Sequence, residues 1–410
     1  MPEFLTLKPP REALTTFFDH LTFDPKPETI PVEDSLDRIL FFAVRADVPI
    51  PAFRRSTVDG FAVHAADTYG ASESLPAYLP LVGEVPMGAA PDFALQPGEC
   101  AVIHTGGMLP EGADAVIMIE YTQQAGEKEI ELLRAVAVGE NLIEIGEDVQ
   151  AGEEVIPAGT RLRPAEIGGL MALGITEVEV GRKPLVGILS SGDEVVHPSE
   201  PIAPGQVRDI NSYTLQALVR QAGGEAKLYG VSADKKSALA ELVTRAYREC
   251  DAVVVTAGSS ASVRDLTAMV IDELGEPGVL VHGVNVRPGK PTILGVCDQK
   301  PVIGLPGNPV SALVIAVLFV VPLLRRMLGE RDRRNTPVVE AELEINLSSQ
   351  SGREEWVAVT LIETESGLVA SPVFGKSNLI FTLVRAEGLV KVPADANGLA
   401  AGSKVSVYLM

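Results

Sequence analysis

The feature that most constrains the fold is an alternation of strand-length apolar runs and amphipathic segments between Pro184 and Gly329. The apolar runs are Leu185–Leu189, Ala226–Val231, Ala252–Thr256 and Val279–Val284. Helical periodicity follows three of them, beginning near Asn211, Asp234 and Asp265. Such alternation predicts a parallel sheet covered by helices on both faces, that is, a three-layer α/β domain. Ligands of these sheets collect at the carboxyl ends of the strands, so the site is expected there.

The most informative strand end is Gly304–Ser311, with the sequence GLPGNPVS. Pro306 and Gly307 would end the preceding apolar run, Asn308 suits a helix N-cap, and the following proline suits the first helical position. A helix that begins here would present unpaired N–H groups and the positive end of its dipole, which favour phosphate. The predicted anion site comprises Pro306, Gly307, Asn308 and Pro309, with Lys290 of the segment RPGKP as a nearby cation. A simple turn, which Pro and Gly favour, would explain the same residues without a bound anion.

Two more strand ends carry polar, glycine-containing loops. The sequence SSGDE occupies residues 190–194, and AGSSASVRD occupies residues 257–265. Small hydroxyl residues and glycines let the backbone approach a phosphate, and the carboxylates Glu194 and Asp265 could hold a Mg²⁺ that bridges it. Either carboxylate alone would also suit an ordinary helix N-terminus. If the loops meet at one sheet edge, they form a composite phosphate and metal site.

Composition argues against several classes of partner. The chain has 34 Lys+Arg and 55 Asp+Glu residues, a formal net charge of −21, so neither nucleic acid nor an anionic membrane is expected to bind it. The three cysteines form no C-x-x-C pair, which favours core thiols in a reducing, cytoplasmic compartment. No signal peptide is predicted, and the apolar run Val310–Leu324 is too short for a membrane span.

The flanking regions predict further domains, so the fold class is multidomain α/β plus β. Short apolar runs broken by Gly and Pro predict a β-rich insert at 49–140. Alternating strands predict a small C-terminal β-barrel or sandwich at 336–410, and the α/β domain occupies 183–330. Residues 1–48 and 141–182 are predicted to form a discontinuous linker domain with helices at Arg11–Leu21, Glu33–Ala46 and Pro164–Leu173.

A series of motifs resembles the molybdopterin molybdenumtransferase family, the bacterial MoeA and gephyrin E-domain group, over nearly the whole chain. The motifs are STVDGFA at 56–62, TG at 105–106, PEGADAV at 110–116, SGDE at 191–194, DIN at 209–211, RD at 264–265, RPGKP at 287–291 and GLPGNPVS at 304–311. Each is modest alone, but their order and spacing together are highly specific.

The resemblance implies the last step of molybdenum cofactor biosynthesis: molybdate is inserted into adenylylated molybdopterin, and AMP is released with the help of Mg²⁺. It implies that Glu194 and Asp265 hold the metal. The implied catalytic residues are Asp59, Thr105, Glu194, Asp234 and Asp265. The implied substrate-binding residues are Ser190, Ser191, Gly192, Asp193, Gly258, Ser259, Lys290, Pro306, Gly307, Asn308 and Pro309.

The family also implies a homodimer in which the insert of one subunit reaches toward the α/β domain of the other. Asp59 and Thr105 would then complete the site across the interface. Without the resemblance, Asp59 suits the first position of an Asp-Gly turn, and Thr105 is a hydroxyl residue at a strand end.

The chain departs from the family at Ala257 and Ser262, where members commonly have glycine. Because a side chain there resists positive φ, a different loop path is expected. Two alternatives remain: a molybdopterin adenylyltransferase, which shares a similar α/β unit, and a non-catalytic molybdopterin-binding scaffold. The insert and the C-terminal β region argue against the first, and the acidic residues Asp59, Glu194, Asp234 and Asp265 argue against the second.

Overall fold

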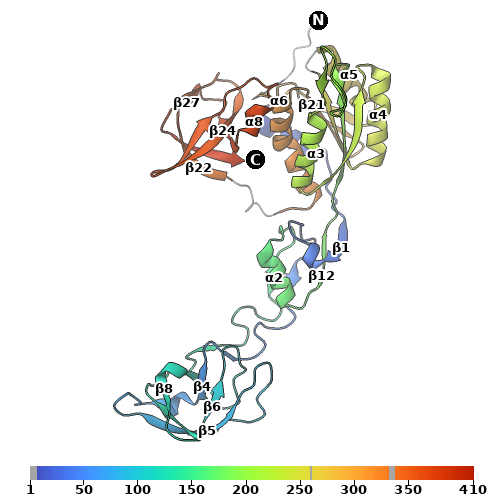
Figure 1. Cartoon of the computed structure of the whole chain (residues 1–410). Helices are drawn as coiled ribbons and strands as arrows, with labels where there is room; N and C mark the ends of the chain where they lie inside the picture. The colour runs from blue at the N-terminus through green and yellow to red at the C-terminus, as the bar shows by residue number, and fades with distance from the viewer. Residues whose placement is uncertain (1–6, 259–260, 332–337) are drawn as a thin grey trace. The chain divides into compact units, whose positions relative to one another are not determined.

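The structure is a computed structural model that describes residues 7–258, 261–331 and 338–410. The chain forms two compact units (Figure 1). The main unit contains the described residues of Met1–Phe41, Ala158–Arg163 and Glu177–Met410. The insert unit contains Phe42–Pro157 and Pro164–Thr176. The boundaries of the four predicted domains stay predictions.

The main unit is built on a six-stranded sheet. Its spatial order is β16 (Glu225–Ser232), β13 (Leu185–Ser191), β17 (Ala252–Ala257), β21 (Lys300–Pro306), β20 (Ile293–Cys297) and β18 (Pro277–His282). The strands from β16 to β21 are parallel, whereas β20 is antiparallel to both of its neighbours, β21 and β18. Positive φ at both Asp298 and Gln299 closes the β20–β21 hairpin, a connection that only antiparallel strands allow. At this edge of the sheet, where parallel pairing was expected, β20 therefore lies between β21 and β18 with antiparallel pairing on both sides.

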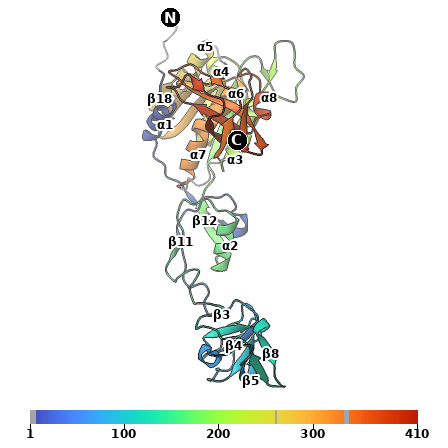
Figure 2. The same ribbon diagram turned by 90° about the vertical axis from the view of Figure 1, so that its left-hand side faces the viewer.

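Helices cover both faces of this sheet, which confirms the predicted three layers (Figures 1 and 2). The first face carries α1 (Pro10–Asp19), α3 (Asn211–Gln221) and the run α6 (Pro309–Ile315), η4 (Ala316–Val320) and α7 (Val321–Met327). The second face carries α4 (Lys236–Glu249) and α5 (Ala261–Asp272). Leu239, Val243 and Ala246 of α4 are buried at helical spacing, which explains why this segment packs as a helix.

The stretch Pro309–Met327 is long and apolar enough to cross a membrane by length and composition alone. Its Ile315, Phe319 and Leu323 are nevertheless buried in the cluster that covers the first face of the main sheet. This packing is typical of the core helix of a globular domain.

The C-terminal region forms a closed five-strand barrel, as predicted. Its strands are β24 (Glu354–Thr364), β25 (Gly367–Pro372), β22 (Val338–Leu343), β28 (Lys404–Leu409) and β26 (Gly388–Val392), and pairing of β24 with β26 closes the circle. The short strand β19 (Val286–Arg287) joins β24 from the main α/β region. Smaller elements of this region are β23 (Leu347–Ser348), α8 (Phe381–Val384) and β27 (Gly398–Leu399).

The insert unit is β-rich, also as predicted, and holds a second six-stranded sheet. Its order is β7 (Ala115–Met118), β4 (Gly60–Val63), β6 (Cys100–Ile103), β5 (Ala77–Glu84), β9 (Glu129–Leu132) and β8 (Thr122–Gln124). The unit also contains α2 (Pro164–Ala172), η2 (Ala65–Thr68), η3 (Ile119–Tyr121) and the short strands β2 (Val44–Arg45), β3 (Arg55–Ser56), β10 (Leu142–Ile143) and β11 (Glu154–Ile156). In the main unit, β1 (Pro27–Pro31) pairs with β12 (Glu177–Gly181), and β14 (Val195–Val196) pairs with β15 (Val207–Arg208).

Of the three predicted flanking helices, the first and third are confirmed as α1 and α2. The prediction of a helix at Glu33–Ala46 is wrong, because the 3-10 turn η1 (Val32–Asp34) and the short strand β2 form there instead. Asp37 has a positive φ, and Ile39 and Leu40 form isolated β-bridges with the distant residues Arg161 and Val180. Long-range pairing therefore overrides the local helical pattern.

Candidate functional site

A buried hydroxyl network joins the ends of β13 and β17. Ser190 Oγ donates to Asp209 Oδ1 at 2.9 Å and shares hydrogen bonds with Ser212 Oγ at 3.1 Å and Thr256 Oγ1 at 2.8 Å. All four side chains are buried. Ser190, a predicted substrate-binding residue, thus has its hydroxyl engaged inside the protein, where it fixes the start of α3 against two strands.

The loop after β13 meets the loop after β16. Ser191 Oγ donates to Asp234 Oδ1 at 2.6 Å, and the Asp234 N–H donates to Asp193 Oδ1 at 3.1 Å. The structure therefore brings these three predicted site residues together. A Cβ on Gly192 would lie 2.9 Å from Glu194 Oε2, so the glycine lets the Glu194 carboxylate lie against the loop. Glu194 itself is exposed.

The predicted anion site, a cradle formed by Pro306–Pro309, begins where β21 ends, at Pro306. Asn308 is in the N-cap position with extended backbone angles, and Pro309 is the first helical residue, as predicted. The side chain of Asn308 does not cap the helix, however, because Nδ2 donates to Ser377 Oγ at 3.0 Å. The Val310 N–H donates to Ser377 O at 3.0 Å. The segment between β25 and α8 thus occupies one N–H that we expected to be open to an anion.

The cradle also contacts β17 and α3. A Cβ on Gly307 would lie 2.9 Å from Ala257 O and 3.3 Å from Gly258 Cα, so only glycine fits without displacing the β17 loop. Asn211 Nδ2 donates to Gly307 O at 2.8 Å, while Asn211 Oδ1 is buried without a hydrogen-bond partner. A buried acceptor left unpaired costs about 1–3 kcal/mol. A donor group on a ligand would relieve this cost.

The remaining predicted residues of the main unit are less engaged. Lys290 is exposed, whereas Arg287, the other cation of its turn, pairs with Glu355 of β24 at 3.2 Å. Asp265 is exposed on α5, which begins at Ala261 rather than at the predicted Asp265. Ser259 lies outside the described residues. Within the described ranges, no group of three or more His, Cys, Asp or Glu side chains is arranged to hold a metal ion.

The departure at Ala257 is accommodated in the strand itself. Ala257 is the last residue of β17 and does not have a positive φ. Ser262 belongs to α5. The expected change in the loop between them involves residues outside the described ranges and stays a prediction.

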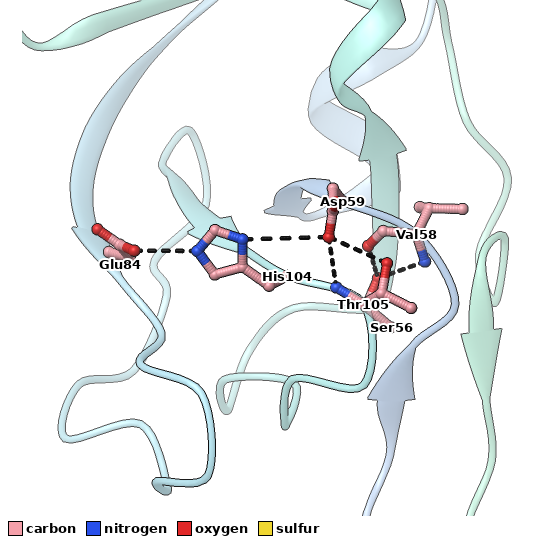
Figure 3. A network of polar contacts seen from close by, with 6 residues as sticks. All are labelled: Ser56, Val58, Asp59, Glu84, His104 and Thr105. Atoms are coloured by element: carbon pink, nitrogen blue, oxygen red, sulfur yellow. Dashed lines mark hydrogen bonds and ion pairs between the residues drawn. The ribbon is translucent and has the colours of Figure 1, made fainter.

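A second polar cluster lies at one edge of the insert sheet (Figure 3). The Thr105 N–H donates to Asp59 Oδ1 at 2.7 Å, and Thr105 Oγ1 donates to the same oxygen at 3.0 Å. Asp59 and Thr105 meet because β4 and β6 are antiparallel, with Gly60 opposite Ile103. Hydrogen bonds from the Thr105 N–H and then from its hydroxyl lower the pKa of Asp59, with a smaller electrostatic contribution from His104, so this exposed carboxylate stays ionised near neutral pH.

Two members of this cluster were missed by the sequence analysis. His104 Nε2 lies 3.0 Å from Glu84 Oε1, and His104 Nδ1 lies 4.0 Å from Asp59 Oδ1. His104 precedes a family motif and could have been noticed for that reason. Glu84 stands outside every motif, and only the pairing of β5 with β6 reveals it.

Comparison with known protein families identifies three consecutive segments. Residues 8–174 match the MoeA N-terminal region (domain I and II), residues 187–326 match a probable molybdopterin binding domain, and residues 340–410 match the MoeA C-terminal region (domain IV). The three segments contain both polar clusters described above.

Individual relatives match over most of their length. A putative molybdopterin biosynthesis protein of Methanocaldococcus jannaschii is 34% identical, covering 97% of this chain and 95% of the relative. The molybdopterin molybdenumtransferase of Bacillus subtilis is 32% identical, covering 95% and 91%. A crystal structure of the molybdopterin biosynthesis MoeA protein of Pyrococcus horikoshii superposes with a TM-score of 0.86 at 33% identity, covering 99% of this chain and 100% of that one. The chain therefore belongs to the MoeA family of molybdopterin molybdenumtransferases.

Proposed function

We propose that this protein is a molybdopterin molybdenumtransferase that inserts molybdate into adenylylated molybdopterin and releases AMP. The observation that carries the proposal is the composite polar edge of the main sheet, in a chain whose relatives in Bacillus subtilis and other species are named molybdopterin molybdenumtransferase. At this edge the Ser191–Asp234–Asp193 network lies at the ends of β13 and β16. The close-fitting Gly307 follows the end of β21 and lies against the end of β17, and Asn211, with its unpaired oxygen, begins α3 and donates a hydrogen bond to Gly307 O.

The side chains at this edge have two roles, to hold the loops in place and to bind the substrate. The buried Ser190 network holds β13, β17 and α3 in place, and the Ser191 hydroxyl fixes Asp234. The cradle at Pro306–Pro309, with Gly258 and the exposed Lys290, would bind the phosphate groups of the substrate. Asn211 Oδ1 would accept a hydrogen bond from an N–H or O–H of the ligand, which favours a polar organic group beside the phosphates.

The donor set fits Mg²⁺, which prefers carboxylate oxygens and commonly takes its other ligands from water and substrate phosphates. Glu194 and Asp265 are the exposed carboxylates that would hold it. When bound, Mg²⁺ would neutralise negative charge on the phosphoanhydride as AMP leaves. With two carboxylates as its protein ligands, the ion would take its remaining ligands from water and from the phosphates of the substrate.

We also propose a homodimer in which Asp59 and Thr105 of one subunit complete the site of the other. The support is chemical: the Asp59 side chain is 61% exposed and ionised, and the contacts described for it engage only Oδ1. Its Oδ2 is therefore open to a ligand. A cytoplasmic location is proposed as well, because Cys100, Cys250 and Cys297 are free thiols buried in the protein.

The alternatives are less favoured. An adenylyltransferase would need only the α/β unit, whereas this chain also matches the MoeA N-terminal and C-terminal regions. A non-catalytic scaffold would have no use for the Asp59–Thr105 pair or for the ordered Asp234.

The test is an assay of the purified protein with adenylylated molybdopterin, Mg²⁺ and molybdate, which should release AMP and form active cofactor. Glu194→Ala and Asp265→Ala should each slow AMP release by at least about a hundredfold, or roughly 2.7 kcal/mol. Glu225→Ala is the matched control, because this exposed carboxylate lies at the amino end of β16 and should leave the rate unchanged. Nucleotide binding without turnover would favour the scaffold, and consumption of ATP with unmodified molybdopterin would favour the adenylyltransferase.

A further inference from the structure

Three acidic or basic side chains outside the main sheet meet at one edge of the insert sheet. Glu84 is the last residue of β5, His104 follows the end of β6, and Asp59 precedes β4. Because β5 is parallel to β6 and β4 is antiparallel to it, these three positions share an edge. Figure 3 shows the imidazole between the two carboxylates.

The geometry assigns a proton to one ring nitrogen. A carboxylate accepts hydrogen bonds only, so His104 Nε2 must carry the proton in its 3.0 Å contact with Glu84 Oε1. Nδ1 then faces Asp59 Oδ1 at 4.0 Å. With a second proton on Nδ1, the ring is a cation between two anions, and it attracts Asp59 toward the side on which Thr105 already donates two hydrogen bonds.

Glu84 has a definite part in this arrangement. It fixes the ring plane and keeps Nδ1, rather than a carbon atom, directed at Asp59. The turn that carries Asp59 is fixed separately, because Ser56 Oγ donates to Val58 O at 2.6 Å and accepts from the Val58 N–H at 3.2 Å. The backbone of Asp59 is thus fixed by its turn, while its carboxylate is oriented by Thr105 and His104.

We propose that His104, held by Glu84, is a positioning residue that keeps Asp59 Oδ1 on Thr105 and thereby presents Oδ2 to the ligand. This inference rests on the proposed function, in which Asp59 takes part in turnover. His104 is 42% exposed, so its attraction for Asp59 is partly screened by solvent. The expected effect of losing it is therefore about three- to fivefold rather than orders of magnitude.

The kinetic test compares His104→Gln with Asp59→Asn and with the double variant in the full-length protein. His104→Gln should lower kcat about three- to fivefold and leave KM within twofold, and His104→Arg, which places a permanent cation at this position, should recover most of the loss. In the Asp59→Asn background, His104→Gln should have no further effect. His64→Gln is the matched control, because His64 is a histidine of the same sheet region that contacts a backbone oxygen, Leu95 O, instead.

A wild-type rate in His104→Gln together with a slow Asp59→Asn would overturn this inference and leave the proposed function standing. An equal loss in the wild-type and Asp59→Asn backgrounds would also overturn it, because His104 would then act independently of Asp59.

A second measurement does not depend on activity. The amide signal of Thr105 in a ¹H–¹⁵N spectrum reports its hydrogen bond to Asp59. His104→Gln and Glu84→Gln should each move this signal part of the way toward its position in Asp59→Asn, and His64→Gln should not. An unmoved Thr105 signal in His104→Gln refutes the inference even if the protein has a different activity.

Discussion

Gly60→Ala tests how closely β4 and β7 must approach for Asp59 to be placed. An added Cβ would lie 1.9 Å from Ile117 O and 2.9 Å from Ile117 C, both backbone atoms of β7. An ordinary contact between carbon and a carbonyl oxygen is about 3.3–3.6 Å, so the strands must separate by more than an ångström. All four residues of β4 are buried, which leaves little room to adjust. Overpacking of this kind costs about 3 kcal/mol.

Urea unfolding can locate this loss within the molecule. With a slope of about 2 kcal/mol per molar urea, the midpoint of the insert unit should fall by about 1.5 M. The only tryptophan, Trp356, lies in β24 of the main unit, so its fluorescence should follow a separate, unchanged transition. Far-UV circular dichroism should show the early transition of the insert sheet. Gly126→Ala is the control, because its Cβ would meet nothing within 4 Å.

Two outcomes would refute this reasoning. If the midpoint of Gly60→Ala stays within about 0.3 M of the wild type, the close approach of β4 to β7 is not required. If the Trp356 transition falls by the same amount as the circular dichroism transition, the cost is not confined to the insert unit.

Three more predictions concern the main unit and the thiols. Glu330→Ala should lower the free energy of unfolding by about 3 kcal/mol, and with it the urea midpoint of the Trp356 transition, because it removes the carboxylate that accepts two hydrogen bonds from the nearly buried Arg161. An unchanged midpoint contradicts this prediction. Gly307→Ala should weaken AMP binding about tenfold by calorimetry, because its methyl group would lie 2.9 Å from Ala257 O; an affinity within twofold of the wild type rules this out. Burial raises the pKa of Cys100 to about 12 and of Cys297 to about 11, so at pH 8 the native thiols should hardly react with Ellman's reagent, whereas all three cysteines should react after unfolding; rapid reaction of the folded protein would disprove their burial.

The sequence predicted the main sheet well because its strands and helices carry strong, local periodicity. The helices α3 and α4 begin at or within two residues of the predicted positions. The sequence did not reveal that β20 and β18 are antiparallel, because an apolar run has the same pattern in either direction. The helix predicted at Glu33–Ala46 was wrong for a related reason. Its apolar residues face distant strands rather than one helical face.

The cradle at Pro306–Pro309 shows a different limit of prediction from sequence. Proline and glycine chemistry correctly predicted that Asn308 precedes the helix and that Pro309 begins it. Asn308 and Val310, however, donate hydrogen bonds to Ser377, a residue almost seventy positions away, in the barrel region. Local rules assign the side chain of an N-cap to its own helix, whereas the tertiary structure gave this asparagine a different acceptor.

At the edge of the insert sheet, sequence motifs identify some residues of the polar cluster, whereas the strand register identifies others. Asp59 and Thr105 stand in recognisable motifs, but the position of Glu84 depends on a bulge in β5. Leu81 is opposite Cys100 and Gly83 is opposite Ala101, so Val82 is one extra residue on β5. In an uninterrupted ladder Glu84 would be opposite Ile103, and the side chains of β5 beyond Val82 would exchange faces relative to β6. Because a bulge has no reliable sequence signature, the contact between Glu84 and His104 emerges only from the folded sheet.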